Sequence, residues 1–334
     1  MSVDADRRSR LVGLKLRALV RDHLGGAEVA EPVEFSPGAA LVHDRTAWVL
    51  LAERPGSMLG AALAWMLRSG AERLSVLAEE DTGILARRAA AFGRAVDVWH
   101  VDGRLLVPAV PASLEPPPAI PAAHESFRGL IAEAGAEPQS EHGVLFGDVF
   151  GLEVCRVVDD RYLGTTRLEV GVGAHDREAF QMLHGDVPTV ESLRRIVETV
   201  RRHRRVDAPP HPLNRLAAER FVRWRVMEDP AVVGASELSP AEPPVPRPNL
   251  KDAVPCVAAG RAVDGRLVVV VCSSGVDLAL VPYAVAARAA VEATVPGAVG
   301  GTRLVVVTPA RDRLRLTEDL AALLDQPIEF VSLD

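Results

Sequence analysis

The sequence predicts an α/β protein in which two Rossmann-like β-α-β-α-β units flank a central α+β module of the order α-β-β-β-α. Short apolar runs that suit buried strands alternate with segments of helical periodicity in the first and third parts of the chain. The middle part instead has three closely spaced strand-like segments followed by helices. The chain is therefore expected to combine two sheets of parallel strands with one antiparallel hairpin.

Two proline-rich segments mark the boundaries between these parts. Proline lacks a backbone donor and fixes φ, so neither segment suits a helix interior or a central strand. Both are predicted to be extended linkers. The expected domains are an α/β unit at 1–107, a linker at 108–121, the central module at 122–230, a second linker at 231–249 and a second α/β unit at 250–334.

The first unit opens with an amphipathic helix at about 11–24, which two glycines stop. Strands are expected at the short apolar runs. Helices are expected at longer segments that begin at a capping residue and end at a glycine. The strands are predicted at 48–52, 73–78 and 96–101, with intervening helices that end at Gly70 and Gly93.

The third part repeats this order without visible sequence similarity. Its strands are predicted at 267–272, 303–308 and 328–332, with helices at 276–293 and 317–324. A three-stranded parallel sheet leaves much of its edge exposed. We therefore expect the first and third parts to pack against each other.

The central module begins with a helix at 124–134. Three strands follow, and the polar turn at 159–164 predicts an antiparallel hairpin between the second and third of them. The strands are expected at 142–149, 151–158 and 166–173, and later helices at 176–184, 189–204 and 213–227.

Three carboxylates of this module form the first candidate site. Glu153 and Glu169 would face the same surface if they pair across the hairpin, with Asp148 at the strand end. Alternation places Arg167 on this acidic face and Arg156 on the opposite face. Such a group could hold Mg²⁺ or Mn²⁺ and activate water for phosphodiester hydrolysis. The alternative is a half-solvated sheet with polar residues on its wet face.

A helix carrying Glu133, three strands carrying these carboxylates, and a further helix together resemble the core of the PD-(D/E)xK (restriction-endonuclease-like) nuclease superfamily. The resemblance covers residues 123–184 and implies a metal-dependent nuclease centre at Asp148, Glu153 and Glu169.

The family's signature lysine, two positions after its acidic residue, is missing. Val170-Gly171 follow Glu169, and Val154-Cys155 follow Glu153. Because that lysine helps to stabilise charge at the attacked phosphate, the resemblance implies a nuclease-like module and leaves its catalytic activity open.

A basic segment forms the second candidate site. Between Arg194 and Arg225 there are ten arginines against three acidic residues, in a chain whose formal net charge is −7. Arginines at helical spacing could neutralise phosphates, and an aromatic ring beside them could stack on a base. The alternative is a solvated face with internal ion pairs. The candidate nucleic-acid-binding residues are Arg194, Arg201, Arg202, Arg205, Arg220, Arg223 and Trp224.

The strand-to-helix loops at 55–57 and 273–275 are the third candidate. Ligands of parallel α/β sheets bind outside the carboxyl ends of strands, and helix N-termini favour anions. Neither loop matches a dinucleotide or P-loop pattern. These loops support an alternative function, in which the paired units bind a nucleotide-like anion as a regulator.

Three dispersed cysteines and the lack of a long apolar run favour a cytoplasmic protein that does not enter a membrane. Three functions remain open: a nucleic-acid-associated protein with a nuclease-like module, an anion-binding regulator, and a non-catalytic scaffold. The expected partners are nucleic acid or a second copy of the chain in a homo-oligomer.

Overall fold

The structure, a computed structural model, confirms a mixed α/β fold with three sheets. It describes residues 3–160, 164–173, 177, 190–209, 211–247, 253–295 and 301–333. The chain forms two compact units, each built from separate segments. Unit 1 contains Met1–Leu114, Val276–Ala286 and Leu314–Ile328, and unit 2 contains Glu115–Gly275, Ala287–Arg313 and Glu329–Asp334.

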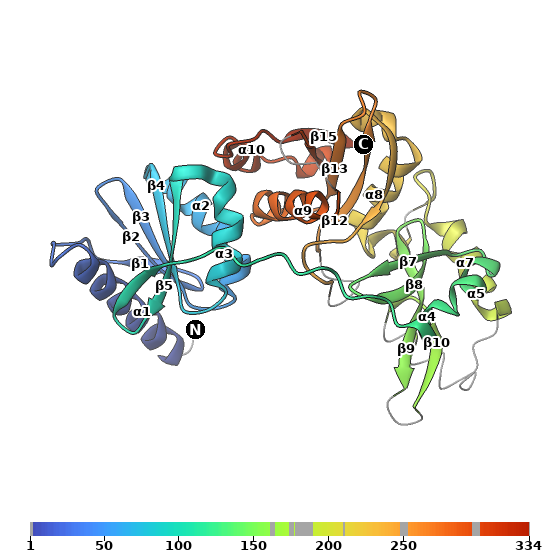
Figure 1. Cartoon of the computed structure of the whole chain (residues 1–334), viewed down its shortest axis with the longest axis horizontal. Coiled ribbons are helices and arrows are strands. Elements are labelled where there is room, and N and C mark those ends of the chain that lie inside the picture. Colours follow the sequence, from blue (N-terminus) through green and yellow to red (C-terminus); the bar gives the residue numbers. More distant parts are fainter. Residues whose placement is uncertain are drawn as a thin grey trace. The chain divides into compact units, whose positions relative to one another are not determined.

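Unit 1 contains a six-stranded mixed sheet of order β1-β2-β3-β4-β5-β6 (Figure 1). Strands β3, β4 and β5 are parallel, whereas β1, β2 and β6 are joined by antiparallel pairing. The strands are β1 (Val33–Phe35), β2 (Gly38–His43), β3 (Thr46–Leu51), β4 (Arg73–Ala78), β5 (Val96–Asp102) and β6 (Leu105–Pro108). The helices are α1 (Val3–His23), η1 (Pro55–Ser57), α2 (Leu59–Ser69), α3 (Thr82–Ala89) and η2 (Ala90–Ala95).

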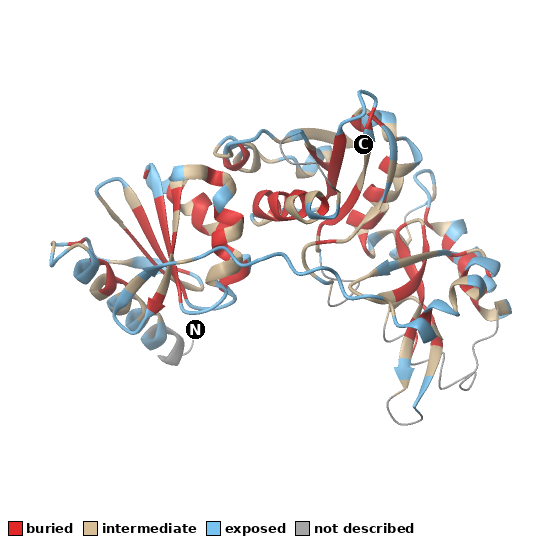
Figure 2. Cartoon of the chain, in the orientation of Figure 1, coloured by how far each residue is buried: buried red, intermediate tan, exposed pale blue. Residues whose placement is uncertain are grey.

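The helices cover both faces of this sheet. Trp48 and Leu50 of β3 pack with Leu16 of α1, while the alternate residue Val49 is buried on the opposite face. Figure 1 shows α1 on one face and α2 with α3 on the other, and Figure 2 shows the buried residues concentrated along the central strands.

The last sheet, in unit 2, has the order β11-β12-β13-β14-β15. Its strands are β11 (Ala235–Ala241), β12 (Cys256–Ala262), β13 (Leu267–Cys272), β14 (Arg303–Pro309) and β15 (Glu329–Leu333). The helices along this part of the chain are α8 (Ala218–Glu228), η4 (Pro230–Val233), α9 (Leu280–Thr294), η5 (Ala310–Asp312) and α10 (Arg315–Ala321). Helix α10 and the first half of α9 belong to unit 1. Helix α8 packs its Val222 and Val226 on the core of this sheet.

The first and last sheets repeat one topology. The order α1-β1-β2-β3-α2-β4-α3-β5 recurs as α8-β11-β12-β13-α9-β14-α10-β15. In both, the strands lie in sequence order and only the second strand runs against the other four. The parallel β-α-β-α-β run predicted for each part is present, but each belongs to a mixed sheet.

The antiparallel strands of these two sheets were not predicted. Strand β11 lies in the segment expected as a linker, 231–249, and contains Pro240 at the edge of its sheet. Strands β2 and β12 are rich in alanine and glycine, so their apolar signal is weak. Strands β2 and β12 are stabilised by pairing with a strongly apolar neighbour, β3 or β13. Their own sequences do not indicate this stabilisation.

The central sheet is antiparallel throughout, in the order β10-β9-β8-β7. Its strands are β7 (Glu137–Glu141), β8 (Val144–Val149), β9 (Leu152–Asp160) and β10 (Thr165–Val170). Its helices are α4 (Ala122–Glu125), α5 (Arg128–Glu133), α7 (Val190–His203) and η3 (Pro212–Arg215). The predicted hairpin is confirmed as β9–β10, and the polar strand β7 was missed. The predicted helix at 176–184 lies outside the described residues except for Arg177.

The expected packing between the first and third parts is present within unit 1, but helices and loops make it rather than sheet edges. A Cβ atom built on Gly60 of α2 would lie 1.9 Å from the Leu278 carbonyl oxygen. Downstream of α10, the Asp325 N–H donates to the Ala91 carbonyl oxygen at 3.0 Å. The sheet edges are instead extended by antiparallel strands.

Replacing Gly60 with alanine should therefore destabilise unit 1 by about 1–3 kcal/mol, because the new methyl group meets backbone that cannot rotate away. The matched control is Gly129→Ala in α5, where a Cβ would meet nothing within 4 Å. Helix propensity predicts that this control gains up to about 1 kcal/mol. Urea unfolding measures both, and equal stability of the two variants would contradict the contact.

Candidate functional site

A bulge in β9 decides where the predicted carboxylates point. Asp148 of β8 is opposite Glu153, and Gly147 is opposite Cys155, so Val154 is an extra residue in β9. Phe146 is opposite Arg156. Because Phe146 and Asp148 share a face, their partners Arg156 and Glu153 also share one.

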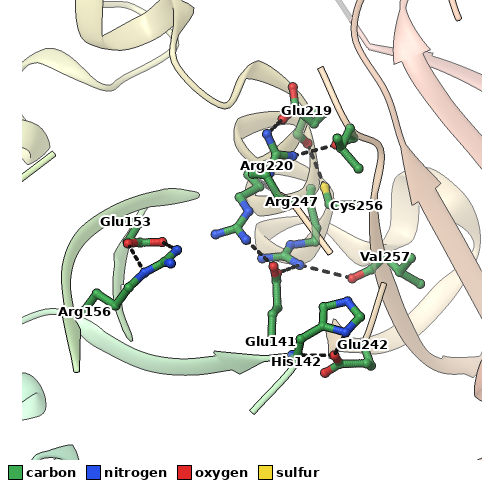
Figure 3. Close-up of polar contacts among 12 residues, drawn as sticks. Glu141, His142, Glu153, Arg156, Glu219, Arg220, Glu242, Arg247, Cys256 and Val257 are labelled. Carbon is green, nitrogen blue, oxygen red and sulfur yellow. Dashed lines mark hydrogen bonds and ion pairs between the residues drawn. The ribbon is translucent and has the colours of Figure 1, made fainter. Parts of the chain in front are cut away.

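Arg156 therefore binds Glu153, contrary to the prediction from simple alternation. Its Nε lies 2.8 Å from Oε1 and its Nη2 lies 2.8 Å from Oε2, which makes a bidentate ion pair (Figure 3). Glu153 is only 2% exposed. The buried carboxylate of Glu153 is thus paired with a partly exposed arginine.

Glu169 is not opposite Glu153. The β9–β10 register places Glu169 opposite Arg156, so the predicted direct pairing of the two glutamates is wrong. Two further arginines hold these carboxylates. Arg167 lies 3.1 Å from Glu169, and the buried Arg177 bridges to Glu153 at 3.0 Å and to Glu169 at 3.5 Å. The result is an alternating group of arginines and glutamates.

Asp148 lies in a cross-strand row with Glu137 and Glu153 but has separate partners. Its Oδ1 accepts a hydrogen bond from the Gly151 N–H at 2.7 Å. Burial raises the pKa of Asp148, and the charges of nearby arginines oppose this shift. In the part of the chain that the structure describes, no three His, Cys, Asp or Glu side chains gather as a metal-binding group.

Arg220 and Arg223 of α8, predicted to contact nucleic acid, are buried beside the central sheet. Both pair with Glu141 at the end of β7, and Figure 3 labels Arg220 and Glu141. Arg223 lies 3.4 Å from Glu141 and also donates to the Val257 carbonyl oxygen at 3.3 Å. Each arginine side chain is 4% exposed. They join the central sheet to α8 and β12 and are inaccessible to a polyanion.

A second buried ion pair extends this network. Glu219 of α8 pairs with Arg247, and both side chains are less than a tenth exposed. The guanidinium of Arg220 also lies over the Phe146 ring, 5.0 Å from its centroid. We call Glu141, Glu219, Arg220, Arg223 and Arg247 the buried ion-pair network.

Arg204 is the most completely buried charged residue among those described, at 0% exposure. It follows α7 and donates hydrogen bonds to five backbone carbonyl groups. Burial lowers the pKa of Arg204 to about 10, which still leaves it charged at neutral pH. The acceptors are the carbonyl oxygens of Phe150, Gly151, Leu213, Leu216 and Ala217.

Trp224 stacks inside unit 2. Its ring lies 4.4 Å from Phe150 and 5.4 Å from Phe221, measured between centroids. The predicted base-stacking ring is therefore already packed against two aromatic side chains.

The remaining predicted arginines are exposed on or just beyond α7. Arg194 pairs with Glu133 at 2.9 Å and Arg205 pairs with Asp207 at 2.9 Å. Arg201 donates to the Gly135 carbonyl oxygen at 2.7 Å. Arg202 is exposed and pairs with no other described residue. This surface keeps part of its positive charge.

The two candidate anion-binding loops are closed by aspartates of their own unit. The Gly56 N–H donates to Asp81 Oδ2 at 3.3 Å in unit 1, and the Gly275 N–H donates to Asp312 Oδ2 at 2.8 Å in unit 2. Each aspartate follows the fourth strand of its repeat, β4 or β14. The same kind of hydrogen bond thus closes the corresponding loop in each repeat.

One signal for the buried ion-pair network is present in the sequence. Glu219, Val222, Arg223 and Val226 follow helical spacing along one stripe, so two charged residues share the apolar face of α8. Arg204 and Glu141 give no such signal, because their partners are distant in sequence.

None of the helices in the described ranges is long and apolar enough to cross a bilayer. Comparisons with protein-family models, with curated proteins and with solved structures found no match to this chain.

Proposed function

We propose that this chain is a non-catalytic scaffold protein whose polar clusters join its own elements. The observation that carries the proposal is that arginines already neutralise two of the three carboxylates of the candidate catalytic site, Glu153 and Glu169. A hard metal ion would have to displace Arg156 and Arg177 from these carboxylates, at the cost of leaving a buried guanidinium unpaired.

The repeated loops support the same proposal. A phosphate that approached the N–H of Gly56 or Gly275 would meet the carboxylate of Asp81 or Asp312 already bound there. The negative charge of that carboxylate repels a phosphate at such a distance. These loops favour a structural bond over an anion site in both repeats.

A scaffold and a metal centre predict opposite effects of Glu153→Gln on the stability of the protein. As an ion-pair partner, Glu153 neutralises the buried Arg177, so Glu153→Gln should lower the free energy of unfolding by about 3 kcal/mol. In a metal centre, the same change would relieve repulsion and leave the metal-free protein equally or more stable. Urea unfolding with and without Mg²⁺ or Mn²⁺ measures the sign of this change in the free energy of unfolding.

The control is Glu133→Gln, which removes an exposed ion pair with Arg194 and should cost less than about 1 kcal/mol. A stabilising Glu153→Gln, metal-dependent stabilisation of the original chain that this change abolishes, or cleavage of plasmid DNA would overturn the scaffold proposal and favour the nuclease-like one.

Nucleic-acid binding through α7 is the second candidate function. It rests on the exposure of Arg201, Arg202 and Arg205, with Arg202 free of any described ion-pair partner. Because a carbonyl oxygen holds Arg201 without cancelling its charge, two adjacent arginines remain available to phosphates.

Changing these three arginines to glutamine should weaken binding to single- or double-stranded DNA and reduce the salt slope by roughly one unit for each lost phosphate contact. The matched control changes three exposed arginines of unit 1, Arg45, Arg68 and Arg94, and alters net charge equally. Equal effects of the two triple changes on a salt titration would exclude α7 as a specific surface.

A further inference from the structure

The two repeats differ at one sheet edge. In unit 1, β6 pairs antiparallel with the outer side of β5. Strand β15 occupies the corresponding place in the last sheet, and within the described ranges only β14 pairs with it. The outer backbone N–H and C=O groups of β15 therefore have no strand to bind, which is the usual template for adding a strand.

The other edge strands of the described sheets carry features that hinder such pairing. Strand β1 has three residues, and β10 carries Arg167 and Glu169. Prolines interrupt three more edges: Pro108 in β6, Pro138 in β7 and Pro240 in β11. Short length, charge and proline are the features that natural sheets use against edge pairing.

Strand β15 lacks these protections. Its sequence is Glu-Phe-Val-Ser-Leu, with no proline and one charged residue at its first position. Arg303 of β14 already binds that residue, Glu329, through two contacts of 2.8 and 2.6 Å. The rest of the edge is half-buried and rich in residues with high strand propensity.

We propose that β15 pairs with β15 of a second copy of this chain, antiparallel about a two-fold axis perpendicular to the sheet. Such an axis necessarily pairs a strand with its own copy in the antiparallel direction, and this is the direction in which β6 pairs with β5. The second copy thus supplies what β6 supplies in unit 1, and two five-stranded sheets become one continuous sheet.

Centring the axis on Val331 pairs all five residues of β15. Val331 then faces Val331 of the second copy, Phe330 faces Ser332, and Glu329 faces Leu333, so no like charges are opposed. Val331 and Leu333 pack toward the core beneath α8, which lies over β11 to β14. The paired strands would extend that core across the axis.

This interface goes beyond the proposed function and does not depend on it, because a scaffold and a nucleic-acid-binding protein can equally form it. Sedimentation velocity of the full chain over a range of concentrations should show a reversible monomer–dimer equilibrium. A cysteine at the axis then tests the register. Residues that face each other across antiparallel strands are about 4.5–5.5 Å apart between Cα atoms, within the reach of a disulfide.

Val331→Cys is therefore expected to give a disulfide-linked dimer when treated with diamide, which accepts the two hydrogens that the thiols lose. The control is Ser332→Cys, whose two copies would be about 8 Å apart between Cα atoms and unable to link. The native thiols Cys155, Cys256 and Cys272 are buried, so the original chain should give no linked dimer. Nonreducing electrophoresis reads the result.

Selective linkage through position 331, together with a dimer in sedimentation, supports the interface. A chain that remains monomeric at every concentration and does not link through position 331 overturns it. A dimer that links equally through position 332, or through neither position, also overturns it, because the two copies would then meet elsewhere or in another register.

Discussion

Replacing Glu141 with glutamine is expected to lower the free energy of unfolding of unit 2 by about 3–5 kcal/mol. Glu141 is the shared partner of Arg220 and Arg223, whose side chains are each only 4% exposed. An amide keeps the size of the side chain but removes the charge. Two guanidinium groups would then remain in the interior without the carboxylate that they share, and neither can lose its proton at ordinary pH.

The matched control is Glu191→Gln, which breaks the exposed ion pair with Arg195 on α7. Exposed pairs of this spacing contribute about 0.3–0.5 kcal/mol. Chemical unfolding of both variants measures the difference. Similar small losses for the two changes would mean that water reaches Glu141 in solution and that the buried ion-pair network does not join the central sheet to α8.

Among the described arginines, Arg204 is expected to be the least replaceable. Its single guanidinium satisfies five backbone carbonyl groups from two separate segments. Removing it leaves buried acceptors unpaired, at about 1–3 kcal/mol for each that water cannot reach. We expect Arg204→Met to cost at least about 4 kcal/mol, which is exceptional for one substitution.

Arg204→Lys should fall between the original chain and Arg204→Met, because an ammonium group has three donors and lacks the planar fork of a guanidinium. The adjacent exposed residue provides the control: Arg205→Met and Arg205→Lys should each change stability by less than about 1 kcal/mol. If Arg204→Lys were as stable as the original chain, the carbonyl groups would have to be satisfied by other partners.

Much of the secondary structure could be predicted because the apolar pattern of some segments is strong. The run at 267–272 is buried along its whole length, and it forms β13 as expected. Strand β7 could not be predicted from the same signal, because Glu-Pro-Gln-Ser-Glu is polar and lies at a sheet edge. Its stability depends on pairing with β8, which is a property of the assembled sheet.

At the candidate site, the sequence alone could not predict which face of the sheet each side chain occupies. The bulge at Val154 shifts the register by one residue, and a one-residue shift moves every later side chain to the other face. The sequence pattern is compatible with both registers. Only the packed sheet shows that Arg156 lies beside Glu153, and this one difference changes the interpretation from a metal site to an ion pair.

By itself, the sequence of this protein determined the α/β class, the parallel β-α-β-α-β runs and the central hairpin, because these depend on local periodicity and turn chemistry. Only the tertiary structure decided which charged residues meet. Glu141 and Arg220 are 79 residues apart, and Glu153 and Arg177 are 24 apart. The local pattern can place a charged residue on an apolar helix face, but it does not identify the residue that pairs with it. Whether an arginine faces a phosphate or a buried carboxylate therefore depends on how distant segments pack.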